Sequence, residues 1–450
     1  MNSSFDVVVV GAGVAGAACA KFLAEGGRRV ALVDRRPFSH AGARWVNGVP
    51  ADAFDDARIA RPRSPELRSE GHAFIVASPS GRTRVRLQPS PVLEVDMRHL
   101  GDRMREGARA AGAKIYEETA VSDVALEGGG PVSIVAGGDV LDAKLFVDAS
   151  GLPAVVRRHV FPHWPDIPRE HLCLAAQSVH EITDVDAARR YLADHELGEG
   201  EVYAQTGTHG GYSVFNIRVD PHEREVSLLT GAVPDSGSTG AQMIDEFVRS
   251  HPWVGARIFG GAGALPLRRP YSRLVSRGLA LLGDAGSQMF PAHGSGIAIG
   301  LRAARLLADV VLDVDASQAG DEEVLFRYAS RFHRAHAGSL CGYDAVRRMA
   351  QRFSVEDSEL FYSSGLAAEA TVHAALAQRL PSANAHEMLA TARAAARAPW
   401  LAARAAAVLA KMPLFVANAR TYPSRLDLKG IESYEARTAR LMGEGADPVS

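Results

Sequence analysis

The hydrophobic pattern at the start of the chain predicts a strand, a helix and a second strand in direct succession. Phe5 to Val10 is a nearly continuous apolar run, which is typical of a strand buried on both faces of a parallel sheet. A helical segment follows from Ala17 to about Glu25 and ends at the pair Gly26-Gly27, and Arg29 to Val33 forms a further apolar run. We therefore expect this part of the chain to begin a parallel sheet.

Three later regions have patterns of their own. Ala143 to Val147 and Leu279 to Leu282 are short apolar runs that predict two more buried strands. Residues 201–233 alternate between apolar and polar side chains, which predicts antiparallel strands. From about Glu322 onward, alanine, arginine and leucine recur at helical spacing. The predicted fold class is α/β, with a Rossmann-like domain, an inserted antiparallel sheet and a helical C-terminal region.

Three glycines follow the first predicted strand at the spacing G-x-G-x-x-G. In this spacing Gly11 permits a tight turn, Gly13 lets a pyrophosphate approach the backbone, and Gly16 lets the helix pack closely on the strand. Asp34 ends the second strand, where an acid is placed to accept hydrogen bonds from ribose hydroxyls. The unit predicts a dinucleotide site, but it does not separate NAD from FAD because both contain the same adenosine diphosphate.

A second motif, within residues 279–311, favours a flavin. Gly283 permits a close approach of the backbone, Asp284 offers a carboxylate, and the segment from Pro291 to Gly296 leads backbone amides into the start of a helix. A helix N-terminus that points at a redox ring would stabilise the negative charge of a reduced flavin. The two motifs together therefore point to FAD.

Four segments resemble the glutathione-reductase type of FAD fold, and within it the superfamily of aromatic hydroxylases, geranylgeranyl reductases and flavin-dependent halogenases. They are the opening glycine motif with Asp34, EVDMRHL at 94–100, FVDASGLPAVVRR at 146–158 and GDAGSQMFPAHGSGI at 283–297. The last segment is the most specific of the four. The resemblance implies an enzyme, an FAD-dependent oxidoreductase.

The resemblance also implies which residues contact FAD. Arg98 would reach the phosphates or the ribityl chain, Asp148 would close the nucleotide side of the domain, and Asp284 would hold the ribityl chain. The flavin ring would be lined by Gly283, Pro291, Gly294, Gly296 and Ile297. His293 lies in the same loop and is a candidate for proton transfer or for packing. The motif D-A-S-G at 148–151 differs from the adjacent Asp-Gly of aromatic hydroxylases, which leaves NADPH or NADH open as electron donor.

The predicted organisation places the antiparallel sheet over the reactive face of the flavin. The expected division in chain order is 1–168 and 262–320 for the FAD-binding domain, 169–261 for the substrate-domain sheet, and 321–450 for the helical C-terminal region. A substrate pocket between the domains follows, since ligand sites favour domain interfaces. Tyr212, Phe215 and Phe290 are candidate pocket residues, which favours a largely apolar small molecule, aromatic or polyene; plain core packing explains each of them equally well.

Several reactions are compatible with these features. Monooxygenation through a flavin hydroperoxide is favoured, because it requires little dedicated side-chain chemistry beyond a dry pocket. The alternative is hydride transfer to or from a carbon-carbon bond, as in geranylgeranyl reductases, which LPLRRPYSRL at 265–274 and PAHGSGI at 291–297 resemble; GGYSVFNI at 210–217 lacks the tryptophan and proline of that branch. Halogenation is least favoured, because the W-x-W-x-I-P signature is absent and no lysine lies between Arg35 and Met97. A redox-neutral cyclase or isomerase is a further alternative.

Composition and charge narrow the range of partners. The 450 residues include 50 basic and 52 acidic side chains, so the chain lacks the basic excess of nucleic-acid-binding proteins. Three distant cysteines suggest neither disulfides nor a thiolate zinc site and fit a reducing cytoplasm. No carboxylate completes a metal triad with His333 and His336, so no metal is expected. A separate reductase is a candidate partner, and the arginine-containing helix at 390–412 permits membrane contact, although a helix between the pocket and water is favoured.

Overall fold

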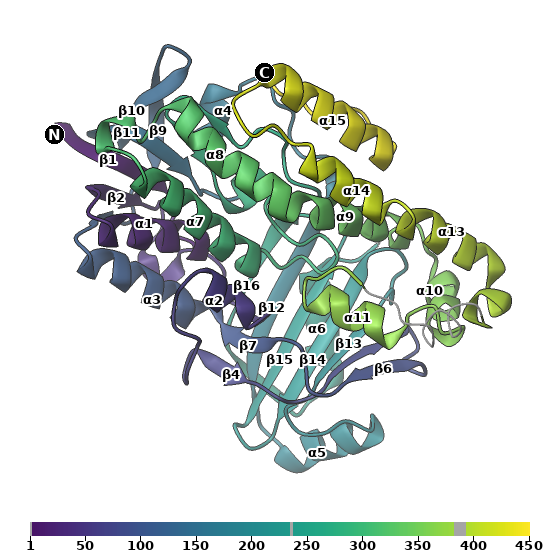
Figure 1. Cartoon of the computed structure of the whole chain (residues 1–450). Coiled ribbons are helices and arrows are strands. Elements are labelled where there is room, and N and C mark those ends of the chain that lie inside the picture. Colours follow the sequence, from purple (N-terminus) through teal and green to yellow (C-terminus); the bar gives the residue numbers. More distant parts are fainter. Residues whose placement is uncertain (1, 235–236, 382–392) are drawn as a thin grey trace.

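The computed structural model describes residues 2–234, 237–381 and 393–450, and it begins with a largely parallel sheet (Figure 1). The main path of this sheet has the order β17-β18-β11-β1-β2-β8, and all its neighbours are parallel except β17 and β18. The bounds are β1 (Asn2–Val10), β2 (Val30–Val33), β8 (Lys114–Tyr116), β11 (Asp139–Asp148), β17 (Val275–Ser276) and β18 (Leu279–Leu281). An antiparallel hairpin of β9 (Val121–Glu127) and β10 (Gly130–Ala136) extends from β11.

Helices pack on this sheet and complete the parallel-sheet domain. They are α1 (Val14–Glu25), α3 (Met97–Ala110), α7 (Ile297–Leu312) and α8 (Glu322–Phe332), with the short α2 (Asp52–Asp56) and α4 (Arg157–Val160) at the edges. Helix α1 contacts both α3 and α7 (Figure 1). Val7, Val8 and Val9 of β1 are fully buried, as expected of a strand covered on both faces.

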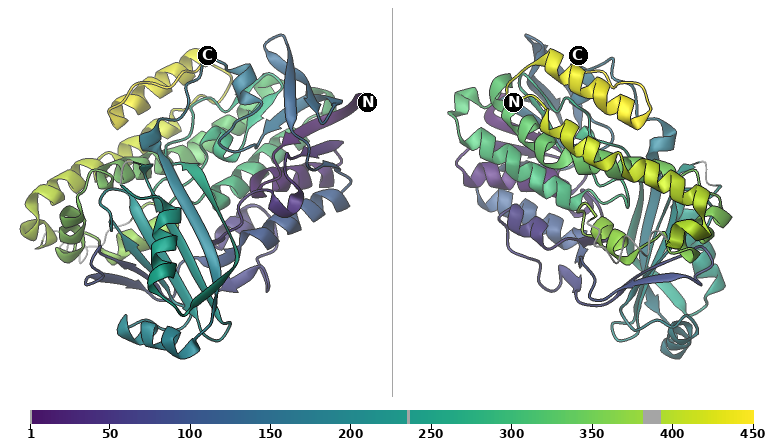
Figure 2. Two further views of the ribbon diagram at one scale, coloured as in Figure 1. Left: turned by 180° about the vertical axis from the view of Figure 1, so that it is seen from behind. Right: turned by 45° about the vertical axis from the view of Figure 1, so that its right-hand side comes forward.

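A seven-stranded sheet forms the second layer of the molecule, the antiparallel-sheet domain. Its order is β16-β12-β15-β14-β13-β5-β6, and only β13 and β5 run parallel. The bounds are β5 (Phe74–Ala77), β6 (Arg84–Leu87), β12 (Leu172–Ile182), β13 (Val202–Thr206), β14 (Ser213–Asp220), β15 (Glu225–Ala232) and β16 (Val254–Pro266). Helix α6 (Gly240–Ser250) covers its outer face, as seen from behind in Figure 2, and α5 (Val185–Asp194) lies at its far end.

A small three-stranded sheet connects the two domains. It contains β3 (Val46–Val49), β7 (Leu93–Asp96) and β4 (Leu67–Ser69), in the order β3-β7-β4. The buried Gln177 side chain of β12 joins this sheet to the large one, because its Nε2 donates a hydrogen bond to the Val46 carbonyl at 3.0 Å and its Oε1 accepts one from the Val46 amide. The position of β3 between the domains is therefore fixed by the side chain of a strand far away in the sequence.

The C-terminal region is helical, as predicted. It contains α9 (Gly338–Ala350), α10 (Val355–Ser363), α11 (Glu369–Leu376), α13 (Pro399–Leu409), α14 (Met412–Arg420) and α15 (Leu428–Met442). Helix α14 packs on α9 and α15, and α13 continues from it along the outside of the molecule (Figure 2). The histidine pair His333 and His336 lies in one turn of π-helix, His333–Ala337, between α8 and α9.

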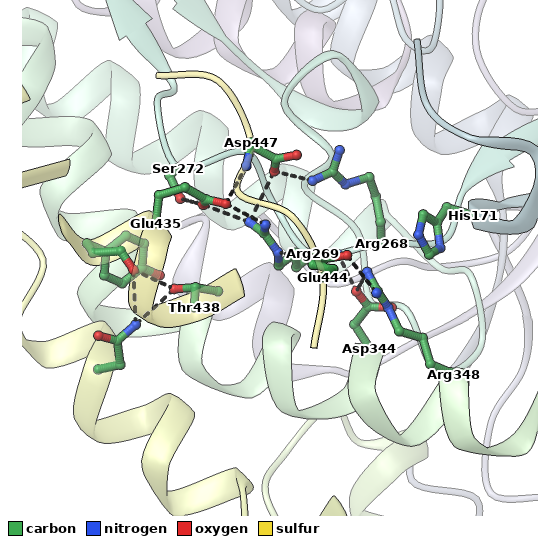
Figure 3. Close-up of polar contacts among 12 residues, drawn as sticks. His171, Arg268, Arg269, Ser272, Asp344, Arg348, Glu435, Thr438, Glu444 and Asp447 are labelled. Atoms are coloured by element: carbon green, nitrogen blue, oxygen red, sulfur yellow. Dashed lines mark hydrogen bonds and ion pairs between the residues drawn. The ribbon is translucent and has the colours of Figure 1, made fainter. Parts of the chain in front are cut away.

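A buried charge network fastens the end of the chain to the parallel-sheet domain (Figure 3). The Arg269 guanidinium donates to both carboxylate oxygens of Glu435, at 2.6 and 2.9 Å, and both side chains are 1% exposed. Arg269 also pairs with Glu444 at 2.7 Å and with Asp447 at 3.1 Å. Burial alone would lower the pKa of Arg269. The carboxylates of Asp447 and Glu435 instead raise this pKa well above its ordinary value. This charge network, Arg269 with Glu435, Glu444 and Asp447, holds α15 and the residues after it against the chain near β17.

The predicted fold class is confirmed, while the predicted boundaries differ in two places. The first strand, helix and second strand form as expected, although the helix begins earlier, at Val14. Residues 74–87, predicted within the first part of the FAD-binding domain, pair instead with β13 of the large antiparallel sheet. Strand β16 runs through the predicted boundary at residue 261. Both differences arise from long-range strand pairing, which no local pattern encodes.

Candidate FAD and substrate site

The glycine turn between β1 and α1 has no room for side chains against the protein, but it is open on one side. A Cβ added at Gly11, where φ is +108°, would lie 2.2 Å from the Ala149 carbonyl oxygen. A Cβ at Gly16 would lie 2.0 Å from the Gly11 carbonyl oxygen, so α1 packs directly on the turn. At Gly13 the nearest such contact is 3.6 Å, to the Gly42 Cα. The middle glycine thus keeps open the approach that a pyrophosphate needs at a helix N-terminus.

Two charged side chains hold this turn in place. Asp34 accepts hydrogen bonds from the amides of Ala12 and Arg36, at 2.8 and 2.9 Å, at the end of β2 where the sequence predicts a ribose ligand. Arg105 of α3 is 3% exposed and donates to the carbonyls of Ala12 and Ala41, at 3.0 and 3.3 Å. Sequence reasoning missed Arg105, because its spacing within an amphipathic helix gives no sign that it turns inward.

Asp148, predicted to contact the cofactor, has its carboxylate fully engaged by the protein. One oxygen accepts from the amide and hydroxyl of Ser150, and the other accepts from the amides of Val156 and Arg157, all between 2.6 and 3.1 Å. Burial raises the pKa of Asp148, and these hydrogen bonds oppose that effect. The side chain therefore shapes the loop that packs on Gly11, which corrects the expectation of a direct ligand.

The second motif lies beside the first, as the FAD resemblance requires. Cβ atoms added at Gly283 and at Gly300 of α7 would lie 3.8 and 3.0 Å from the Ala15 Cβ of α1. The buried Gln288 closes the turn, since its Oε1 accepts from the Gly283 amide at 2.9 Å and its Nε2 donates to the Tyr328 hydroxyl at 2.7 Å. Neither Gln288 nor Tyr328 was expected from the sequence. Their contacts bring the starts of α1 and α7 to one side of the parallel sheet.

Asp284 differs from Asp148 in having no bound partner. Within residues 2–234, 237–381 and 393–450, no side-chain hydrogen bond or ion pair of the Asp284 carboxylate is found, and burial raises its pKa to about 6. A Cβ added at Gly296 would lie 3.5 Å from one of its oxygens. A partly buried carboxylate without a protein donor is suited to accept hydrogen bonds from a ligand. Asp284, Gly13 and the starts of α1 and α7 thus fit FAD, and Asp284 would accept hydrogen bonds from its ribityl hydroxyls.

The loop from Phe290 to Ser295 forms a tight turn before α7. The Phe290 amide donates to the Ser295 carbonyl, and the Gly294 amide donates to the Phe290 carbonyl, both at 3.0 Å. The fold thereby brings Pro291, Gly294, Gly296 and Ile297 together around the predicted ring position. Phe290 itself is fully buried and packs on Tyr343 and His293, with ring centroids 4.5 and 4.8 Å apart. Its predicted place in the substrate pocket is wrong.

The Arg98 side chain is engaged in contacts within the protein. Its guanidinium pairs with Asp96 at 2.7 Å and lies 3.3 Å over the Phe259 ring, while its side chain is 25% exposed. The contact with Phe259 links α3 to strand β16 of the antiparallel-sheet domain. These contacts give Arg98 a role in joining the domains; its predicted contact with FAD stays a prediction.

A cavity lies between the loop from Phe290 to Ser295, which we call the flavin loop, and the inner face of the antiparallel sheet. Its walls come from both domains and from α11. The lining residues are Val46, Asn47, Gly48, Phe74, Val92, Glu94, Gln177, Val202, Asn216, Ile217, Arg218, Ser227, Leu229, His293, Ser295 and Leu376. A cavity at a domain interface with apolar walls and a few polar groups is the usual form of a small-molecule site. We call it the interdomain cavity.

Four polar groups of the interdomain cavity have no hydrogen-bond partner among the described residues. Three of them are buried atoms, Asn216 Oδ1, His293 Nε2 and Ser295 Oγ. The fourth is the carboxylate of Glu94 on β7, whose pKa is raised by burial and held back by the charge of Arg218. Burial lowers the pKa of His293 to about 4, so the ring is neutral at pH 7. Buried polar groups without partners mark places where a ligand or water completes the hydrogen bonding.

The other two predicted pocket aromatics lie outside this lining. Phe215 faces the opposite side of β14, where its ring packs 5.3 Å from that of Phe247 in α6. Because side chains alternate along a strand, its neighbour Asn216 faces the interdomain cavity instead. Tyr212 packs with Leu267 and Met289, and its hydroxyl would lie 3.7 Å from a Cβ at Gly294, so it supports the flavin loop. The prediction for Phe215 is wrong by one residue of register, and the cavity is more polar than expected.

Comparisons with known proteins find FAD-dependent oxidoreductases. The family model described as FAD dependent oxidoreductase matches residues 6–209. A curated relative, the digeranylgeranylglycerophospholipid reductase of Methanoculleus marisnigri, is 25% identical over 76% of this chain and 84% of its own length. A solved structure of a geranylgeranyl bacteriochlorophyll reductase-like protein from Thermoplasma acidophilum has a TM-score of 0.72, with 16% identity over 91% of this chain and all of that one. A probable FAD-dependent monooxygenase from Pseudomonas aeruginosa shares the fold at a TM-score of 0.56, with 15% identity over 78% of this chain and 97% of that one.

The fold and the paired nucleotide motifs define a flavoprotein with two interlocked domains. The family-model match and the similarity to digeranylgeranylglycerophospholipid reductases support assignment to the FAD-dependent oxidoreductase superfamily, and the chain is an FAD-dependent oxidoreductase. No group of three metal-ligating side chains is found in the part of the chain that the structure describes.

Proposed function

We propose that this oxidoreductase transfers hydride to a carbon-carbon double bond of a prenyl-type lipid, in place of the oxygen transfer that the sequence favours. The observation that carries this choice is the similarity to digeranylgeranylglycerophospholipid reductases over 76% of the chain, a share that includes more than the nucleotide motifs. Similarity to a monooxygenase concerns the fold alone, at 15% identity. The proposal therefore adopts the alternative function of the sequence analysis.

The lining of the interdomain cavity supports a substrate of mixed character. Phe74, Val92 and Val202 provide apolar walls for a hydrocarbon chain, whereas Glu94 and Asn216 provide unpaired polar atoms. An apolar chain packs against Phe74, Val92 and Val202 without desolvating polar groups. Its double bond then lies toward the loop that contains His293 and Ser295. The cavity is thus suited to a chain that is mostly apolar and carries a polar end.

The protein must also supply a proton. When a double bond is reduced, its π bond breaks, a hydride adds to one carbon and a proton adds to the other. FAD, when bound, supplies the hydride chemistry. Glu94 lines the interdomain cavity and burial raises the pKa of its carboxyl, which favours the protonated form more than in an exposed glutamate, and we assign it as the proton donor. The His293 ring is neutral and packs on the Phe290 ring within the same loop, so we assign it a positioning role.

Product analysis under controlled oxygen tests this function. The purified holoenzyme is given an anaerobic photochemical reductant and a digeranylgeranylglycerophospholipid in detergent, and the products are examined by mass spectrometry. We expect gain of two hydrogen atoms per reduced bond without any oxygen. A product that forms only when oxygen is admitted and that carries an added oxygen atom would establish monooxygenation instead. Reaction with NADPH and with NADH, in parallel, identifies the electron donor.

A further inference from the structure

The outer surface of α13 and α14 exposes an unusual number of large apolar side chains. Trp400, Leu409 and Leu414 are 44%, 41% and 51% exposed, although most side chains of this size are buried in soluble proteins. The segment Pro399–Arg420 is long and apolar enough to cross a membrane by length and composition, and only 22% of its most apolar window is buried. An apolar surface of this kind marks an interaction site.

Contacts on the inner side hold this segment flat against the protein. Met412 and Phe415 are buried, and helix α14 packs on α9 and α15. The Asn418 Nδ2 donates to the Thr438 hydroxyl of α15 at 2.8 Å, and its Oδ1 accepts from Arg437 at 2.8 Å. These contacts would be lost if the segment crossed a bilayer. Figure 2 shows helix α14 beside α15. The geometry favours a helix that lies in the plane of a surface.

The charge of the same segment is entirely positive. From residue 393 to residue 425 the chain has no acidic residue and six basic ones, Arg393, Arg397, Arg404, Lys411, Arg420 and Arg425. The whole protein, by contrast, has a formal net charge of −2. Apolar side chains interspersed with basic ones on an exposed helix are typical of segments that lie in the interface of an anionic bilayer.

A basic groove adjoins this apolar surface. It lies between α9, α13 and α15, and Arg348, Arg352, Arg404 and Lys411 line it together with apolar Met349 and Val408. Arg348 is paired with Glu444 at 2.6 Å, whereas no ion pair of Arg352 or Arg404 is found among the described residues. The Arg404 guanidinium lies 5.4 Å from the centre of the Trp400 ring, which places charge directly beside the apolar surface. The groove thus has two free guanidinium groups available for phosphate.

We propose that α13 and α14 bind the surface of an anionic phospholipid bilayer, with Trp400 and Leu414 in the interfacial layer and a lipid phosphate in the groove of Arg352 and Arg404. The arrangement satisfies both parts of interfacial binding, since apolar area enters the boundary of the acyl chains while basic groups meet the headgroups. This surface is separate from the interdomain cavity, and the inference goes beyond the proposed function.

Vesicle sedimentation tests the proposal without any turnover. The holoenzyme is mixed with vesicles of phosphatidylcholine alone or with phosphatidylglycerol added, at low and high salt. We expect binding to the anionic vesicles that weakens at high salt, because exposed charges are screened. Replacing Arg352 and Arg404 by Gln together should lower the partition coefficient roughly 25-fold, at about fivefold for each basic residue. The combined change Trp400→Ser and Leu414→Ser should abolish the binding that remains at high salt.

Matched controls lie on strand β16, where Arg257 and Ile258 are exposed neighbours and Ile258 is 46% exposed. Arg257→Gln and Ile258→Ser should leave vesicle binding unchanged, and FAD content confirms that each variant is folded. Equal binding to both kinds of vesicle, or no binding, would overturn the proposal. Self-association that Leu414→Ser removes, in the absence of vesicle binding, would assign the surface to a second copy of the chain. None of these outcomes affects the proposed reaction, which is measured in detergent.

Discussion

The charge network at Arg269 and the interdomain cavity both contain charged or polar side chains. These groups have protein partners in the charge network, whereas several in the cavity lack them among the described residues. In the charge network, Arg269 and Glu435 are buried, Glu444 and Asp447 are partly buried, and each of them has a protein partner. In the cavity, Glu94, Asn216, His293 and Ser295 present polar groups that no described residue satisfies. Buried polar groups cost free energy unless they are hydrogen-bonded. The first set therefore stabilises the fold, and the second set is held in place for a ligand.

The same contrast separates two carboxylates that follow strands of one sheet. Asp148 uses four hydrogen bonds to shape its own loop, whereas the Asp284 carboxylate has no protein donor in the described part of the chain. From the sequence alone both residues are predicted as cofactor ligands. The presence or absence of partners is what distinguishes a positioning residue from a binding residue, and the following experiments test that distinction.

The largest effect is expected from Arg269→Met. This change leaves Glu435, Glu444 and Asp447 without their common partner, and breaking a buried ion pair in this way costs about 3–5 kcal/mol of unfolding free energy. Urea unfolding of the holoenzyme measures the loss. The control is Arg327→Met, whose ion pair with Asp313 is more open to solvent, with side chains 35% and 64% exposed, and should contribute less than about 1 kcal/mol. Equal losses in the two variants would contradict the role of the charge network.

Glu94→Gln should slow the chemical step while leaving the fold intact. Loss of a positioned general acid typically lowers the rate by about 100-fold or more. Single-turnover rates with saturating lipid measure this effect separately from lipid affinity. The parent enzyme should lose activity as pH rises through the raised pKa of the Glu94 carboxyl, because the proton is then absent; the variant should lack that limb. An unchanged rate and pH profile would exclude Glu94 as the proton donor.

Asp284→Ala should weaken FAD binding, whereas Asp148→Ala should weaken the fold. Hydrogen bonds to a charged group contribute about 1.5–3 kcal/mol, so the FAD dissociation constant should rise roughly 10- to 100-fold in the first variant. Titration of the deflavinated proteins with FAD, followed by flavin fluorescence, measures this. The unfolding free energy without FAD should fall only in the Asp148 variant. If the two variants exchange these effects, the assignment by hydrogen-bond partners fails.

The stability of the deflavinated protein should depend on pH through the unpaired groups. The pKa of Asp284 is raised from 3.8 to about 6, so the folded state retains a proton that the unfolded state loses, and this contribution to stability falls as pH rises from about 4 to 6. The pKa of His293 is lowered from 6.5 to about 4, so its contribution falls as pH decreases from about 6.5 to 4. Urea unfolding across this range should show that Asp284→Asn removes the first slope and His293→Gln the second. Parallel profiles for both variants and the parent would contradict these shifts.

The smallest effects separate the two faces of β14. Asn216→Leu removes an unpaired polar atom from the interdomain cavity and should raise KM for the lipid by about fivefold, the equivalent of roughly one hydrogen bond. Phe215→Leu acts on the opposite face, where it should lower the unfolding free energy by about 1 kcal/mol and leave KM unchanged. Steady-state kinetics and unfolding of both variants provide the comparison. A change of KM in the Phe215 variant would show that the face of β14 that carries Phe215 contacts the substrate, which contradicts this assignment.

Local sequence patterns predicted the parts of this molecule that local physics determines. The strand, glycine turn and helix from Phe5 to Glu25 form as expected, and so does the turn at Gly283 and Asp284, because each depends on neighbours in the sequence. Arg105, Gln177 and Glu94 were missed, since their roles arise from contacts with distant segments. Phe215 was misplaced because alternation predicts two faces of a strand but not which of them meets the cavity.

Rapid mixing without oxygen tests the central claim most directly. The holoenzyme is reduced anaerobically and mixed with a digeranylgeranylglycerophospholipid or with its fully saturated counterpart, and the flavin absorbance is followed. We predict that the unsaturated lipid reoxidises the flavin in the absence of oxygen and that the saturated lipid does not. A flavin that stays reduced with both lipids, and is reoxidised only when oxygen enters, would contradict hydride transfer to a double bond.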